Sequence, residues 1–140
     1  MRFTLTCRNL KLNRSIGVYA REKIAKLFGK LFKDPRITQA AIIDIEFSRL
    51  TRHHRKGMVW KADAVVALPQ QKGPLYAEAV DEDIHSAIDL LSEEIERELQ
   101  RYKGKSQALA RRGARLAKKD LRFDPSARMF RKGRIRDEGN

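Results

Sequence analysis

The stretch that decides the fold runs from Leu75 to Lys105 and reads LYAEAVDEDIHSAIDLLSEEIERELQRYKGK. It predicts a strand followed by one long helix, starting near Asp81, whose apolar positions recur at helical spacing: Ile84, Ala87, Ile88, Leu91, Ile95, Leu99 and Tyr102. Acidic residues begin this helix and basic residues end it, which suits the helix macrodipole. The basic end continues into an arginine-rich segment, which helix electrostatics do not require. The pattern therefore predicts that one end of the protein binds a polyanion, with RNA as the expected partner.

Outward from this stretch, the chain predicts a second helix and three more strands. Alternation of apolar and polar residues predicts strands over Phe3–Cys7, Ala41–Phe47, Met58–Leu68 and Leu75–Val80. A helix is expected from an N-cap at Asn13 to about Phe32, ended by Asp34 and Pro35. The order β-α-β-β-β-α predicts an α+β fold, with two helices packed on one face of a largely antiparallel four-stranded sheet.

The C-terminal quarter of the chain differs from the rest. Gly104 is expected to end the long helix, and Ser106–Lys119 to be partly helical, with Leu109 and Leu116 on one side. From Asp120 onward there are few apolar residues, so this end is expected to be disordered until it binds a partner. The sequence thus predicts a domain over residues 1–105 and a basic extension over 106–140.

The charge of the chain limits its function. The formal net charge is +13 and the isoelectric point about 10.3, a range in which a nucleic-acid partner is the leading explanation. Residues 1–103 hold 19 Lys and Arg against 14 Asp and Glu, whereas residues 104–140 hold 12 against 4. Most of the excess charge therefore lies in the last quarter of the chain.

The cysteine content and the lack of long apolar segments indicate the cellular compartment. A single cysteine, Cys7, excludes an internal disulfide and fits a reducing cytosol, and its place on the apolar side of a strand favours a buried structural thiol. The chain has no apolar run of membrane-span length and no signal-peptide core at its start. We therefore expect a soluble, cytoplasmic protein without a membrane association.

A stripe of lysines marks the first predicted helix. Lys23, Lys26, Lys30 and Lys33 share one side of it without an acidic residue among them. A solvated helix face is the simpler explanation for any single member. Four aligned cations are moderate support for phosphate contacts, because solubility alone tends to mix the signs of charge.

The connection between the second and third strands is also basic, with Arg49, Arg52, Arg55 and Lys56 around His53 and His54. Two interpretations carry equal weight: a flexible loop kept soluble by its charge, or a basic finger beside phosphates with a histidine stacked on a base. Adjacent histidines without further ligands do not predict a metal site. A ribonuclease using His53 or His54 is the weakest hypothesis, because no catalytic motif accompanies them, and no cofactor is implied.

The segment YAEAVDEDIHSAIDLLSEEIERELQRYKGK and the first-helix segment AREKIAKL resemble the ribosome hibernation-promoting factors, the sigma-54 modulation protein family. The resemblance covers roughly residues 1–105. It implies a fold like a double-stranded-RNA-binding domain, which occupies the tRNA and mRNA cleft of the small ribosomal subunit during starvation and competes with tRNA and mRNA. It implies rRNA rather than DNA as the partner.

The resemblance also implies which residues bind RNA. The family's basic positions fall on Lys26, Arg97, Arg101, Lys103 and Lys105, to which the lysine stripe adds Lys23 and Lys30. The predicted RNA-binding set is completed by two further groups: Arg52, Arg55 and Lys56 of the loop, and Arg111, Arg112 and Arg115 of the extension.

Three features depart from the family pattern. His85 stands where an aromatic residue is expected, and Glu94 and Glu98 stand where the family has lysine and glutamine. Long members also carry a dimerisation domain, for which residues 104–140 are too few and too polar. The alternative to a hibernation factor is a general RNA-binding or chaperone protein, or a constitutive ribosomal component, without an inhibitory role.

Overall fold

The structure is a computed structural model, and it describes residues 1–51, 53 and 56–123. The chain divides into two units, unit 1 over Met1–Arg101 and unit 2 over Tyr102–Asn140. Unit 1 holds a sheet and the helices packed on it, and the described part of unit 2 is helical.

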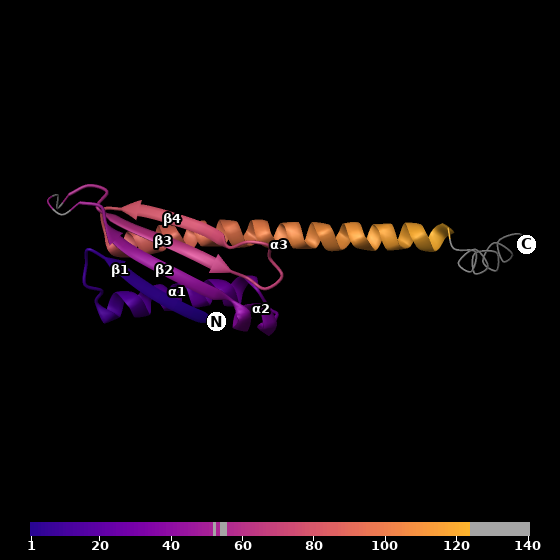
Figure 1. The fold of residues 1–140 in the computed structure, drawn as a ribbon, viewed down its shortest axis with the longest axis horizontal. Coiled ribbons are helices and arrows are strands. Elements are labelled where there is room, and N and C mark those ends of the chain that lie inside the picture. The colour runs from indigo at the N-terminus through magenta and orange to yellow at the C-terminus, as the bar shows by residue number, and fades with distance from the viewer. Residues whose placement is uncertain (52, 54–55, 124–140) are drawn as a thin grey trace, which may run out of the picture. The chain divides into compact units, whose positions relative to one another are not determined.

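Unit 1 is built on a four-stranded sheet in the order β1 (Arg2–Arg8), β2 (Ile42–Arg49), β3 (Trp60–Ala67) and β4 (Leu75–Asp81), shown in Figure 1. Strands β1 and β2 are parallel because the chain between them crosses back through α1 (Arg14–Leu31) and α2 (Pro35–Ala40). The β2–β3 and β3–β4 pairs are antiparallel. The predicted α+β fold with a largely antiparallel, four-stranded sheet is confirmed, and the parallel β1–β2 pair makes the sheet a mixed one.

Helix α1 and the first part of α3 (Ile84–Phe123) pack on one face of the sheet (Figure 1). Alternate residues of the two central strands are buried: Ile43, Ile45, Phe47, Ala62, Ala64 and Val66. Helix α1 buries Ile24 and Phe28, and α3 buries the predicted residues Ile88, Leu91, Ile95 and Leu99. The period-two and helical patterns therefore meet in one core, although Tyr102 is half-buried rather than buried.

Short side chains set the ends and the closest approach of the helices. The Asn13 side chain accepts a hydrogen bond from the Ser15 amide (3.3 Å), which confirms it as the N-cap of α1. Asp83 caps α3 by accepting from the amides of the residues two and three positions on. A Cβ at Gly17 would lie 3.2 Å from the Leu5 side chain, so glycine there lets α1 approach β1 closely.

The prediction for Asp34 and Pro35 was incomplete. Helix α1 already ends at Leu31, and the two residues begin the short helix α2, which was not predicted. The Asp34 carboxylate accepts from the Arg36 amide at 2.9 Å, while Pro35 takes the first helical position, where its fixed φ and missing amide hydrogen cost nothing. The same pair of residues that stops one helix starts another.

The prediction that Gly104 ends the long helix was wrong. Helix α3 continues through Gly104 and Gly113 to Phe123, and a Cβ on either glycine would meet nothing within 4 Å. Each glycine costs about 1 kcal/mol relative to alanine in a helix interior, and the surrounding Ala, Leu, Arg, Lys and Gln residues offset that cost. The start of the expected disorder at Asp120 was also wrong, since Asp120 is helical, and residues 124–140 lie outside the described residues.

Two smaller expectations also change. Strand β3 begins at Trp60, and Met58, expected within the strand, lies before it with 64% of its surface exposed. Cys7, expected to be buried, is half-buried, and this partial burial raises the pKa of its thiol. A raised thiol pKa fits a structural role rather than a nucleophile.

Candidate nucleic-acid interface

The lysine stripe of α1 is divided between two roles. Lys23 forms an ion pair with Asp89 of α3, and Lys30 forms one with Glu96 at 3.2 Å. Both acids lie on α3, seven residues apart, as the two lysines do on α1. Lys23 and Lys30, which were predicted to bind RNA, join the two helices within unit 1, and the prediction that they contact RNA stays a prediction.

The Lys23 pair belongs to a small polar cluster. Asp89 also accepts a hydrogen bond from the Tyr19 hydroxyl at 2.5 Å, and His85 packs edge-on against the Tyr19 ring at 5.2 Å between centroids. The hydrogen bond from Lys23 lowers the pKa of Asp89, and the bond to Asp89 raises the pKa of Lys23 against partial desolvation. The structure gives no Asp89–His85 hydrogen bond; the nearest carboxylate to His85 is Asp83, 3.9 Å from Nδ1.

The other two lysines of the stripe point to solvent. Lys26 and Lys33 are exposed, and neither makes a side-chain hydrogen bond or ion pair with the residues that the structure describes. Lys26 is also the first-helix position that the family resemblance identified. Of the lysine stripe, Lys26 in α1 and Lys33 just after the helix therefore remain available to a phosphate.

Arg97 and Arg101 are exposed on α3 but lie against acids of the same helix. Their guanidinium groups contact Glu94 and Glu98, one turn earlier, with 62% and 71% of the arginine side chains exposed. Exposed pairs of this kind are worth about 0 to 1 kcal/mol each, so a phosphate can compete for the arginines. The two glutamates are the positions that depart from the family pattern, and they reduce the positive potential at the predicted site.

The sheet face that carries no helix is rich in acidic residues. Glu46, Asp63 and Glu78 occupy one register row across β2, β3 and β4. Arg8 pairs with Glu46 at 2.6 Å, and Lys61 bridges Asp63 and Glu78 at 3.0 and 3.3 Å, which raises the pKa of Lys61. Like charges opposite one another destabilise a sheet, so these cations offset that repulsion. Because acids hold Arg8 and Lys61, the part of this face around the acidic row does not suit a polyanion.

The β2–β3 loop is only partly described. Arg52, His54 and Arg55, two of them predicted to bind RNA, lie outside the described residues. Lys56 and His53 are exposed. Arg49 stacks over the Trp60 ring, with 5.5 Å from its Cζ to the ring centroid. The two interpretations of this loop both stand.

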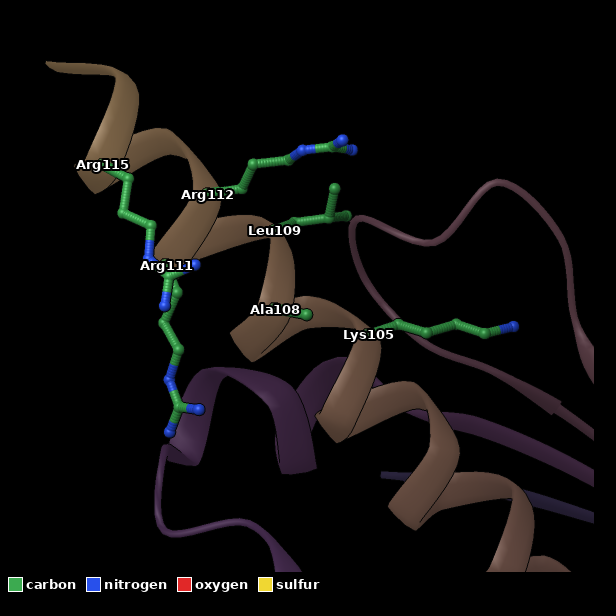
Figure 2. A pocket seen from close by; sticks show the side chains of 6 residues that line it. All are labelled: Lys105, Ala108, Leu109, Arg111, Arg112 and Arg115. Atoms are coloured by element: carbon green, nitrogen blue, oxygen red, sulfur yellow. The ribbon is translucent and has the colours of Figure 1, made fainter. Parts of the chain in front are cut away.

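Unit 2 carries a different kind of positive surface. From Lys103 to Lys119 its charged residues are all basic, and all are exposed. Figure 2 shows Arg111 and Arg115 leaving the helix on one side of Ala108 and Lys105 and Arg112 on the other, around an open hollow. None of these four cations pairs with a described carboxylate. The predicted residues Arg111, Arg112 and Arg115 thus lie together with Lys105, and Lys103 is exposed nearby in sequence.

Chemistry other than binding finds little support. Among the described residues no group of three or more His, Cys, Asp or Glu side chains is arranged to hold a metal ion. In the same part of the chain no helix is long and apolar enough to cross a membrane. What the described site offers is exposed positive charge.

Comparison with known proteins identifies the family. Residues 3–107 match the model of the family described as Sigma 54 modulation protein / S30EA ribosomal protein. A ribosome hibernation promotion factor from Lactococcus lactis subsp. cremoris is 29% identical over 103 residues, which are 74% of this chain and 50% of that protein. The chain therefore spans about half the length of this curated relative.

Solved structures agree on the fold. A ribosomal subunit interface protein from Coxiella burnetii matches with a TM-score of 0.58 and 20% identity, covering 74% of this chain and 99% of that one. The N-terminal domain of Thermus thermophilus Protein Y matches with a TM-score of 0.56 and 24% identity, covering 73% and 99%. With the family model spanning three quarters of its length, this chain belongs to the Sigma 54 modulation protein / S30EA ribosomal protein family.

Proposed function

We propose that the protein is a ribosome hibernation factor that binds the small ribosomal subunit, inhibits translation and preserves idle ribosomes in the cytoplasm under stress. Its family consists of non-enzymatic ribosome-associated factors, and its curated relative is a ribosome hibernation promotion factor. The single observation that carries the proposal is the family match over residues 3–107. This range covers unit 1 from residue 3 onward and the first residues of unit 2.

The proposed mechanism is occlusion. Residues 1–105 act as a folded body in the cleft that tRNA and mRNA otherwise occupy, and residues 106–140 act as a basic extension that follows rRNA. The distribution of charge supports an orientation in which the acidic sheet face is turned away from rRNA. Lys26, Lys33 and the exposed cations of the unit 2 helix favour contact with rRNA phosphates. In this scheme Lys23 and Lys30 hold α1 against α3, and the more exposed Lys30 can also exchange its carboxylate for a phosphate, as Arg97 and Arg101 can.

Inhibition and its relief test the mechanism. Added to a translation extract, the protein is expected to lower initiation, and excess initiator tRNA with mRNA is expected to relieve part of the inhibition. Relief follows because two ligands of one cleft compete by mass action. Full occupancy of ribosomes without inhibition would show that the protein binds elsewhere.

Growth dependence separates this function from the general RNA-binding alternative. A hibernation factor is expected to sediment with ribosomes mainly after growth stops, when tRNA and mRNA leave the cleft. A constitutive ribosomal component or an RNA chaperone would sediment with ribosomes, or with total RNA, equally in growing and starved cells. Quantitative immunoblotting across sucrose-gradient fractions from both states distinguishes the two.

A further inference from the structure

The helix of unit 2 presents five of its cations in two rows. Lys105, Arg112 and Lys119 recur every seven residues along one row, and Arg111 and Lys118 form the second. At 100° per residue the rows lie about 120° apart around the helix, with Ala108 midway between them. Arg115 also lies between the rows, nearer to the second one, and its side chain leaves the helix on the Arg111 side in Figure 2. Figure 2 shows this division at Lys105 and Arg112 on one side of Ala108 and Arg111 on the other.

These cations are not engaged by the protein itself. All five are exposed, and none pairs with a carboxylate in the described part of the chain, where the first acid after Glu98 is Asp120. Arg97 and Arg101, by contrast, contact their own glutamates. The two rows therefore retain their full charge for a ligand, and the Ala108 methyl group leaves room for that ligand to approach the backbone.

We propose that this helix binds double-stranded RNA, with one row of cations on the phosphates of each strand. The inference rests on the proposed rRNA-binding function and names the form of RNA that the extension takes. Side chains about 120° apart on a cylinder whose Cα radius is about 2.3 Å point in diverging directions, so their charged ends are well separated. A single phosphate backbone meets one such row at a time, whereas the two strands that border a groove meet both.

An anionic membrane is the main competitor for a basic helix, and the apolar residues argue against it. Leu109 and Leu116 lie on the same side of the helix, but Leu121 is about 140° around the helix from Leu116. The sector between these two directions holds alanines and Gly113. A helix that lies in a membrane interface needs a continuous face of bulky apolar side chains. Here the bulky residues are separated, and the cations form the ordered pattern.

The test removes one row at a time in the full chain. The variants are Lys105→Gln/Arg112→Gln for the first row, Arg111→Gln/Lys118→Gln for the second, and all four together. The control Lys11→Gln/Lys72→Gln removes two exposed, unpaired cations outside both rows. Glutamine preserves helix propensity, and circular dichroism checks the fold of each variant. The probes are a labelled RNA duplex, one of its strands alone, and vesicles containing phosphatidylglycerol, each measured by fluorescence anisotropy or co-sedimentation.

The expected result is an asymmetry between the two forms of RNA. Either row variant should weaken duplex binding roughly 30-fold at about 0.15 M salt, because each lost phosphate contact forfeits about 0.9 counterion released. The single strand should lose about threefold or less from either row variant, since it can use the other row. It should lose roughly 15-fold only when both rows are removed, at about 0.7 counterion per contact. The control should lose about twofold or less on both forms of RNA.

Three outcomes would overturn the proposal. One is a row variant that leaves duplex binding unchanged; another is equal loss on duplex and single strand from each row. The third is vesicle binding that is stronger than duplex binding and depends on the same rows. Ribosome co-sedimentation of the same samples separates this inference from the proposed function. If the protein still binds ribosomes but shows no asymmetry between duplex and single strand, only the proposal of duplex binding is overturned.

Discussion

Unit 1 and the helix of unit 2 use their cations differently, because several cations of unit 1 pair with carboxylates although others, such as Lys26 and Lys33, do not. In unit 1, Lys23, Lys30, Arg97 and Arg101 each contact a carboxylate of α3, and Arg8 and Lys61 contact carboxylates of the sheet. In the helix of unit 2, the cations from Lys105 to Lys119 contact none among the described residues. The formal charge of a region therefore overstates the charge that it can offer to RNA. Phosphate binding depends on the cations that the fold leaves unpaired.

The largest expected effect comes from neutralising unpaired cations in unit 2. Arg111→Gln/Arg112→Gln/Arg115→Gln should weaken ribosome binding roughly 100-fold at about 0.15 M salt and lower the slope of log K against log salt by about 2 to 3. Titration by ultracentrifugation at several salt concentrations measures both quantities. The matched control Arg2→Gln/Lys11→Gln/Lys72→Gln removes the same charge from exposed sites of unit 1. It should change the affinity by about threefold or less, because charges that do not contact phosphates are screened over a Debye length of about 10 Å. Equal losses from the two variants would erase the contrast between the units.

Freeing the paired arginines should make unit 1 behave more like unit 2. Glu94→Gln/Glu98→Gln removes the carboxylates that contact Arg97 and Arg101, so ribosome binding should strengthen roughly three- to tenfold, since exposed pairs are worth about 0 to 1 kcal/mol each. The same titration measures it. Glu22→Gln/Glu82→Gln removes two exposed acids that hold no arginine and should give a smaller gain. If the double mutant instead binds ribosomes more weakly than the unchanged protein, the glutamates orient the arginines for binding.

The Lys23–Asp89 pair should contribute to stability rather than to RNA binding. Asp89→Asn should destabilise unit 1 by about 1 kcal/mol at neutral pH, the usual worth of such a hydrogen-bonded group. Because the pKa of Asp89 is lowered in the folded protein, its contribution is present above the unfolded pKa of about 3.9 and is lost as the pH falls through the lower, folded pKa. Urea unfolding from pH 6 to pH 2 should therefore show the two proteins converging in stability. A constant difference across this range would assign the effect to something other than the ion pair.

The smallest expected effect concerns the helix of unit 2 alone. Gly113→Ala should slow amide hydrogen exchange around it by up to about fivefold, since alanine is favoured over glycine by about 1 kcal/mol within a helix. The open surroundings of Gly113 mean that the added methyl group meets nothing. Hydrogen exchange followed by mass spectrometry localises the change. Unchanged exchange would show that this segment is not helical before it binds RNA.

The sequence predicted the fold well because its patterns are local. Alternation in the strands and the Ile88–Leu99 stripe in α3 follow directly from which side chains are apolar, and Asn13 acts as a cap through its neighbour Ser15. The errors at Gly104 and Pro35 share one cause. A residue that disfavours a helix on average is tolerated where the neighbours are strong helix formers, or starts a helix where the residue before it is a cap.

The site was harder to predict because ion pairs join distant parts of the chain. Lys23 and Lys30 looked unpaired on their own helix, and their acids, Asp89 and Glu96, lie 66 residues further on. The matching seven-residue spacing of the two lysines and the two acids was the available signal. The acidic sheet face gave no such signal, because its carboxylates come from three strands and only the register brings them together.

A map of the protein bound to the ribosome by electron cryomicroscopy tests the central claim most directly. The account predicts density for the sheet and helices of unit 1 in the tRNA and mRNA path of the small subunit, with Lys26 and Lys33 near rRNA phosphates and the acidic sheet face turned from them. It also predicts the helix of unit 2 against a duplex segment of rRNA. Density for unit 1 outside that path, with tRNA and mRNA still bound, would contradict the account.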